Sequence, residues 1–316
     1  MKRSFKTICM ALVFAMVLGI FAGLPARRET VYAADVAINT TNFPDSLFRE
    51  YVSDTYDKND DNVLSASEAA NATWFDFTST VYDTMYSLKG IEYFPNIVQL
   101  KVSGTKITQL DLSHNTKLTN IDVHGNRLGS LNIDNLTELT KLEAYSNPLT
   151  SLNISDNLKL QSCFVHNTYL ISFDASDHED LVTLWLDGCS RLTGVDVHDC
   201  YDLKWLSLNG TKISSLDISG TPELIDVYRN GTRSDQGYYS YRYDSGAGDQ
   251  ATELDVPYDI VTGNKIYINR PSITFNNDPK NAEITESEDF TLSFTVSKGD
   301  YPKVRYYIEV YSEEGN

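Results

Sequence analysis

Cysteine is scarce in this chain, and its spacing matches neither a zinc site nor a disulfide framework. Of the four cysteines, Cys9 lies in the first apolar stretch. No Cys-x-x-Cys pair is formed by the other three, Cys163, Cys189 and Cys200. The zinc and dithiol motifs that need this pair are therefore missing. A Cys189–Cys200 bridge stays open, but we favour burial of all three residues as small apolar side chains.

The sequence also lacks the motifs of several large enzyme classes. It contains no glycine-rich phosphate loop, no Gly-x-Ser-x-Gly nucleophile motif and no His-Glu-x-x-His helix. Its five histidines are spread from His114 to His198, so we expect no shared catalytic or zinc pocket among them. The sequence therefore predicts a protein that is not an enzyme.

Basic residues are few as well. Lysine and arginine number 26 against 44 aspartates and glutamates, which gives a formal net charge of −18. A surface of this sign repels nucleic acid and anionic lipid head groups and favours cations. We therefore expect neither nucleic acid nor a membrane surface among the partners.

Long apolar runs are missing except for one near the start. Lys2, Arg3 and Lys6 precede the apolar stretch 8–24, and the small-residue site 31–33 follows it. This order is typical of a secretory signal peptide, here residues 1–33, and it predicts a secreted or cell-surface protein. The alternative is an uncleaved membrane anchor, because the stretch is near the lower length limit for spanning a bilayer.

A leucine-type residue returns every 21 or 22 residues through the middle of the chain. Self-similarity at such a short period is typical of a solenoid, in which each coil buries its apolar face only against its neighbours. The repeated position is held by Ile97, Leu118, Leu139, Leu160, Leu181, Leu203 and Leu224. The sequence thus predicts a stack of coils with an extended surface suited to binding.

Each unit is apolar at its first position and at offsets 3, 5, 10, 13 and 15. Offset 8 holds a small residue that we expect to bond the backbone of neighbouring coils, in turn Thr105, Asn126, Asn147, Thr168, Cys189 and Thr211. This pattern closely resembles the leucine-rich repeat L-x-x-L-x-L-x-x-N-x-L. The second half of each unit alternates apolar and polar residues, so we expect short strands or 3₁₀ turns on the back and no helix longer than two turns.

Taken with its flanking segments, the chain resembles secreted internalin-like leucine-rich repeat proteins of clostridial (Lachnospiraceae) type. The resemblance implies a mostly β solenoid with little helix over residues 72–230, starting with an irregular first coil. Residues 231–270 alternate around a glycine turn and predict a capping hairpin; its tyrosines are alternatively a ligand platform. Residues 271–316 resemble the first half of an immunoglobulin-like β domain, so we expect the chain to stop inside a domain.

Residues 34–71 are predicted to form an amino-terminal cap with an EF-hand-like loop. The loop from Asp57 to Glu68 resembles the pattern D-x-[DN]-x-[DN]-G-x₅-E, with Asn62 in place of glycine. Asparagine is tolerated there because it adopts positive φ more readily than other non-glycine residues. The alternative is a solvated acidic cap without metal. The resemblance implies calcium held by Asp57, Asn59, Asp61, Val63 (through its carbonyl), Ser65 and Glu68.

The predicted concave face carries aromatic side chains that are costly to leave in water. Exposed aromatic patches usually mark interaction sites. We therefore predict that the protein binds a protein or glycan there, through Tyr145, Phe164, His166, Trp185, Asp187 and Trp205. For the aromatics, the alternatives are shielding of strand edges or packing against a second region of the chain. For the whole protein, they are a non-catalytic targeting module of a larger exported hydrolase and a structural spacer on the cell surface.

Overall fold

The structure is a computed structural model that describes residues 35–78, 80–243, 250–263 and 265–268, and the backbone of two further strand segments. These segments, β17 (Ile273–Phe275) and β18 (Phe294–Val296), pair antiparallel. Contacts divide the chain into residues 1–32 and 33–316. The predicted signal peptide lies outside the described residues, as does most of the predicted immunoglobulin-like part.

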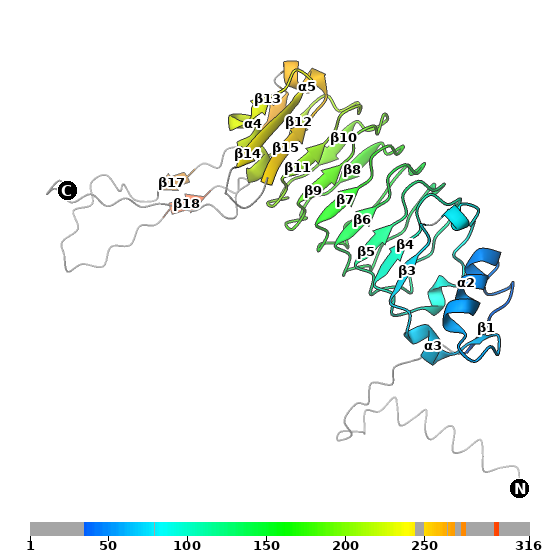
Figure 1. Ribbon diagram of the computed structural model, residues 1–316. Coiled ribbons are helices and arrows are strands. Elements are labelled where there is room, and N and C mark those ends of the chain that lie inside the picture. Colours follow the sequence, from blue (N-terminus) through cyan, green and yellow to red (C-terminus); the bar gives the residue numbers. More distant parts are fainter. Residues whose placement is uncertain are drawn as a thin grey trace, which may run out of the picture. The chain divides into compact units, whose positions relative to one another are not determined.

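One ten-stranded sheet organises the repeat region. Each coil contributes one short strand, paired in parallel with the strands before and after it (Figure 1). Along the sheet these strands are β3 (Trp74–Asp76), β4 (Gln99–Lys101), β5 (Asn120–Asp122), β6 (Lys141–Glu143), β7 (Ser162–Phe164), β9 (Thr183–Trp185) and β11 (Trp205–Ser207). The predicted solenoid of 21- to 22-residue coils is confirmed.

The middle residue of every strand points into the core, because strand side chains alternate between the two faces. The register places these residues in one buried column, namely Phe75, Leu100, Ile121, Leu142, Cys163, Leu184 and Leu206. The back of the stack has only short strands, as the alternating second halves predict. They are β8 (Ser172–Asp174), β10 (Gly194–Asp196), β12 (Leu216–Asp217) and β16 (Ile266–Tyr267), in the parallel pairs β8–β10 and β12–β16.

The asparagines at offset 8 join their coils to the preceding ones, whereas Thr168 and Thr211 at the same offset donate to carbonyls of their own coils. Asn147 Nδ2 donates to Val123 O of the preceding coil at 2.9 Å and to Ala144 O of its own coil at 3.1 Å. Its Oδ1 accepts from Leu128 N at 3.0 Å. The side chain therefore satisfies backbone groups that would otherwise be buried without a partner.

A second polar column, not foreseen from the sequence, runs along the back. Asn157 Nδ2 donates to the carbonyls of Ile133 and Leu136 in the preceding coil. One coil later His178 holds the same position, only 1% exposed, with Nε2 3.0 Å from Ile154 O. His178 is thus a structural residue.

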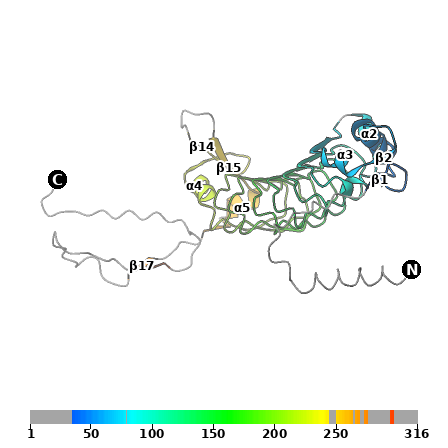
Figure 2. The ribbon, with the colours of Figure 1, turned by 90° about the horizontal axis from the view of Figure 1, so that it is seen from below.

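A small helical cap closes the amino-terminal end (Figures 1 and 2). Asp45 starts the first helix by accepting hydrogen bonds from Leu47 N and Phe48 N, and it also bonds Tyr86 N of the first coil at 2.8 Å. Aromatic rings fill the joint, with Phe48 in edge contact with Phe75. The cap contains β1 (Val36–Ala37), α2 (Ser46–Tyr56), β2 (Val63–Leu64) and α3 (Ala66–Ala70), and the 3₁₀ turns η1 (Thr80–Tyr82) and η2 (Ile91–Tyr93) follow.

The carboxy-terminal end differs from the sequence prediction in one respect. Leu224 does not start another coil, because it is buried on helix α4 (Pro222–Asn230). This helix has about two and a half turns, so the expectation of no helix longer than two turns before residue 230 is wrong there. Pro222 at the first turn suits a helix start, since its missing N–H would have no partner at that position.

Two paired strands follow this helix within the segment predicted to form a capping hairpin, and the predicted glycine turn between them lies outside the described residues. The strands β14 (Tyr238–Tyr243) and β15 (Gln250–Asp255) pair antiparallel, and β13 (Thr232–Arg233) adds to β14. On its other edge β15 pairs in parallel with β11, so Leu254 continues the buried column of the coils. Helix α5 (Tyr258–Gly263) then covers the end of the core with Ile260 and Val261.

Candidate binding face and acidic pocket

The side of the sheet that carries the outward strand residues is called the open face here. Parallel pairing in register aligns these residues into rows across the coils. One row contains Lys141, Ser162, Thr183, Trp205 and Glu253, and the next contains Asp122, Glu143, Phe164, Trp185, Ser207 and Asp255. A third row follows the strands and contains His124, Tyr145, His166, Asp187 and Asn209.

Rings from neighbouring coils form an aromatic ladder on the open face, made of His124, Tyr145, Phe164, His166 and Trp185. His124, Tyr145 and His166 stack nearly parallel, with ring centroids 4.3 and 4.2 Å apart. These spacings are close to the separation of adjacent strands, about 4.8 Å. Because the three residues occupy the same position in successive coils, their rings lie face to face. Trp185 continues the ladder, 5.9 Å from His166 and 5.0 Å from Phe164 in an edge contact.

Charged groups border the ladder at the strands that precede Trp185. His124 Nδ1 lies 2.6 Å from Asp122, and Lys141 Nζ lies 3.1 Å from Glu143. Burial raises the pKa of Tyr145, and the nearby carboxylates of Asp122 and Glu143 add to this effect. The phenol is thus neutral and able to donate a hydrogen bond.

His166 is neutral near physiological pH. Burial lowers the pKa of its imidazole below the ordinary value, although Asp187 acts in the opposite direction. The Nδ1 atom is buried and has no hydrogen-bond partner among the described residues. The ring stacks on Tyr145, and it lines a pocket at the end of the ladder.

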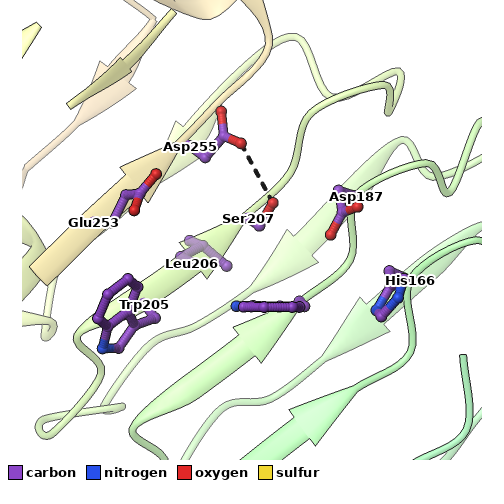
Figure 3. A pocket seen from close by; sticks show the side chains of 8 residues that line it. His166, Asp187, Trp205, Leu206, Ser207, Glu253 and Asp255 are labelled. Atoms are coloured by element: carbon purple, nitrogen blue, oxygen red, sulfur yellow. Dashed lines mark hydrogen bonds between the residues drawn. The ribbon is translucent and has the colours of Figure 1, made fainter. Parts of the chain in front are cut away.

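The ladder ends in a pocket of about 260 Å³, called the acidic pocket here (Figure 3). Indole rings and carboxylates from β9, β11 and β15 surround it, and no lysine or arginine is among the described residues of its wall. Its lining residues are His166, Trp185, Asp187, Trp205, Leu206, Ser207, Glu253 and Asp255. Figure 3 shows the carboxyl groups of Asp187, Glu253 and Asp255 grouped around Ser207 and Leu206.

The environment of Asp255 disfavours its ionised form. Burial, together with the negative charge of Glu253, raises the pKa of Asp255 to about 6. Burial also raises the pKa of Glu253. Asn209 Nδ2 donates to Asp255 Oδ1, and Ser207 Oγ lies 3.5 Å from Oδ2. These neutral donors fix the position of the carboxylate but do not offset its charge.

The predicted ligand residues lie together on the open face. Four of them, His166, Trp185, Asp187 and Trp205, line the acidic pocket, and Tyr145 and Phe164 stand beside it in the ladder. Their role in binding stays a prediction. Sequence analysis did not include His124, although it shares the offset of Tyr145 and His166.

Sequence analysis also missed Glu253 and Asp255. They belong to the hairpin strand β15, which lies outside the period. The signal that would have found them is the apolar pair Leu254 and Val256, which repeats the spacing of the strand and offset-5 positions in each coil. Both residues are buried, so the acids on the alternate positions must face outward.

The predicted EF-hand-like loop joins α2 to α3. Asn62 has φ +60° at the position where the motif holds glycine. Asp57 is only 5% exposed and accepts from the backbone N–H groups of Asp61 and Asn62. Glu68 accepts from Lys58 N and Ser65 N, and it closes a capping box with Ser65 at the start of α3.

The remaining predicted ligands of the loop make local contacts. Asn59 donates to Asp61 Oδ2 at 2.8 Å, and Val63 N donates to Asp61 Oδ1 at 2.8 Å. In the part of the chain that the structure describes, no three histidine, cysteine, aspartate or glutamate side chains are grouped closely enough to hold a metal ion. The carboxylate contacts described for the loop are thus hydrogen bonds within the loop itself, and its metal site stays a prediction.

The cysteines of the repeats are buried free thiols. Cys163, Cys189 and Cys200 form no disulfide with one another, so the bridge left open by the sequence is not present. Burial raises the pKa values of Cys163 and Cys200 to about 12, which leaves them protonated and unreactive.

Comparison with known proteins places the fold among leucine-rich repeat solenoids. The functional domain of InlJ from Listeria monocytogenes, which includes a cysteine ladder, is similar over 60% of this chain, with 28% identity and a TM-score of 0.54. The internalin InlF from the same species is similar over 59% of this chain, with 18% identity and a TM-score of 0.38. No protein-family model and no curated protein matches the sequence.

The matched region covers 41% of the InlJ chain, so less than half of that structure has a counterpart here. The similarity and the observed coils agree on the fold class, a mostly β leucine-rich repeat solenoid with little helix. Within the described residues, no helix has the length and apolar character needed to cross a bilayer.

Proposed function

We propose that this chain is an exported binding protein that recognises a protein or glycan ligand on its open face. The observation that carries the proposal is the aromatic ladder beside the acidic pocket. Trp185 is 39% exposed and sits on a sheet strand, where its position is set by backbone pairing with β7 and β11. A rigid, solvent-facing set of rings loses little conformational entropy when a partner covers it.

The composition of the open face supports a binding role over a purely structural one. Interface residues that contribute most to affinity are enriched in tryptophan, tyrosine and arginine and lie near the centre of a contact. The ladder occupies the middle coils, with strands on both sides of it. The similar solved structure is the functional domain of InlJ, which supports a functional role for the repeat region.

The experiment is a screen followed by ladder variants. The full chain is screened against glycan arrays, mucin and extracts of bacterial and host cells. For a ligand so found, we expect Tyr145→Ala and Trp185→Ala each to weaken binding by more than about 1 kcal/mol, roughly fivefold. Tyr267→Ala is the matched control, because Tyr267 is 59% exposed on the back strand β16.

Full binding by the Tyr145→Ala, Trp185→Ala double variant would refute the proposal. A targeting module or spacer would then be the better account, with the back or the residues after 268 as the next surfaces to test.

We further propose that calcium stabilises the amino-terminal cap. The proposal is supported by the oxygen-bearing residues spaced through the loop and by the positive φ of Asn62. Calcium would be held by the six predicted ligands, Asp57, Asn59, Asp61, Val63, Ser65 and Glu68. The cation would supply charge neutralisation to a loop that carries several carboxylates, of which Asp57 and Asp61 accept hydrogen bonds from backbone N–H groups of the loop.

A further inference from the structure

We propose that the acidic pocket binds the guanidinium group of an arginine side chain presented by a protein ligand. This inference rests on the proposed function of the open face. It names the chemical group of the ligand that the pocket end of that face would recognise. It is carried by two indole rings and three carboxylates that line one small cavity.

The described residues place no counter-charge beside the carboxylates of the pocket. Asp187, Glu253 and Asp255 contribute three carboxylates, and no ion pair among the described residues involves any of them. The one basic residue in the wall, His166, is held neutral by burial. Bringing like charges together without a counter-charge costs free energy, which an entering cation would recover.

The apolar walls favour arginine over lysine. Trp185 and Trp205 present indole rings to the same cavity, and indole is the best aromatic partner for a cation. A guanidinium is planar, weakly hydrated and able to stack on a ring while donating two parallel hydrogen bonds to a carboxylate. An ammonium is a compact and strongly hydrated charge, so it gains less from this combination of surfaces.

Protonation of Asp255 should oppose binding. Its pKa of about 6 in the free protein means that the carboxyl is largely neutral at pH 5 and ionised at pH 7.5. The groups that face it are Glu253 on its own strand, Asp187 after β9, Ser207 and Asn209 from the β11 coil, and Tyr238 opposite it on β14. None of these carries a positive charge, so the affinity for a cation should rise from pH 5 to pH 7.5.

The chain contains three tryptophans, which makes a direct test simple. In a two-dimensional ¹⁵N–¹H spectrum of the full chain, the indole N–H signals of Trp185 and Trp205 report on the pocket. Trp74, at the opposite end of the sheet and 57% exposed, is an internal reference. The probe is N-acetyl-arginine amide, with N-acetyl-citrulline amide as its uncharged counterpart and N-acetyl-lysine amide as a second cation.

We expect arginine amide to shift the two pocket indoles and leave Trp74 unchanged, with citrulline amide inactive and lysine amide at least threefold weaker. The Glu253→Gln, Asp255→Asn double variant should weaken binding at least tenfold. The amide oxygen introduced by Asp255→Asn can still accept from Asn209, so the strand should stay in place. Glu143→Gln, an acid of the same row outside the pocket, should bind like the unmodified chain.

Equal shifts with arginine and citrulline amides, or shifts only with a neutral oligosaccharide such as chitohexaose, would overturn the inference. So would arginine binding that the double variant leaves unchanged. The outcome is separable from that of the proposed function. If arginine amide shifts neither pocket indole but a macromolecular ligand still depends on the ladder, only the arginine-binding pocket is rejected. If arginine amide shifts the indoles but no macromolecular ligand is found, only the proposed binding function is rejected.

Discussion

Asp255 is the open-face residue whose ionisation is most strongly opposed by its surroundings. An unfolded aspartate titrates near pH 3.9, whereas burial and Glu253 raise the pKa of Asp255 to about 6 in the folded protein. Between these two values the native state holds more protons than the unfolded state. The contribution of Asp255 to stability therefore falls as pH rises through this window.

Asp255→Asn removes this titration and should stabilise the free protein at neutral pH. We expect a gain of about 1 kcal/mol at pH 7.5, since solvent screening reduces the full effect at this half-buried site, and almost no difference at pH 4. Thermal melts at the two pH values measure it, as a rise of about 2–4 °C at pH 7.5.

Asp83→Asn is the control, because Asp83 is exposed and its replacement should leave both melts unchanged. If Asp255→Asn were equally neutral at both pH values, the carboxylate would have to be solvated or compensated in solution.

At the residue scale, sequence analysis identified the small polar position at offset 8 but not the second column on the back. The first is visible because asparagine recurs there in successive units. The second is held by Asn115, Leu136, Asn157, His178, Cys200 and Thr221, a set with no common side-chain class. What its polar members share is only a hydrogen bond to buried carbonyls, such as that of Cys200 Sγ to Ala175 O at 3.0 Å.

The loop between α2 and α3 is the element whose behaviour should depend on a ligand. Calcium at about ten times its dissociation constant should stabilise the cap by ~1.4 kcal/mol, with an affinity in the range of extracellular modules, about 10⁻⁴–10⁻³ M. Thermal melts of the full chain with millimolar calcium and with chelator measure the difference.

Glu68→Gln should abolish the calcium-dependent difference, since it removes the carboxylate that the motif uses as a bidentate ligand, while glutamine can still serve in the capping box with Ser65. Asp60→Asn is the matched control from the same loop. Asp60 occupies a non-ligand position of the motif and has φ +55°, which asparagine tolerates. Melts that coincide in calcium and chelator for the unmodified chain would reject the site and leave the loop as a solvated acidic cap.

At the element scale, the strands were predictable because the period fixes which residues must be buried together. Helix α4 was not, because it replaces a coil that the leucine spacing predicts. The two acids that β15 adds to the pocket were missed because this strand lies outside the repeat period. Asp255 and Ser207 contact each other although they are 48 residues apart in the sequence, more than two repeat periods. The contact depends on the pairing of β15 with β11, which the repeat pattern does not predict.

At the scale of the whole molecule, each coil has a finished core only when its neighbours are in place. Leu142 is fully buried in β6, so Leu142→Asp should cost more than about 4 kcal/mol by burying an unpaired charge. Because coils contact only adjacent coils, we expect faster amide hydrogen exchange in β5 and β7 as well as in β6.

Lys141→Ala on the same strand is the control, since Lys141 points to the open face and its surface ion pair contributes less than about 1 kcal/mol. Exchange that accelerates in β6 alone would contradict the nearest-neighbour description of stability.

The two polar columns have a consequence for how the array can change in length. Each reaches back to carbonyls that recur at the same offsets in the preceding coil. If a whole coil were inserted or deleted in the middle, the same carbonyls would still be available to the asparagines of the next coil. The hydrogen bonds between coils therefore do not depend on the number of coils. Such a change would move the acidic pocket relative to the amino-terminal cap by one strand separation, about 4.8 Å. Adding or removing coils can thus change the distance between the amino-terminal cap and the acidic pocket in steps of one coil, while both ends stay the same.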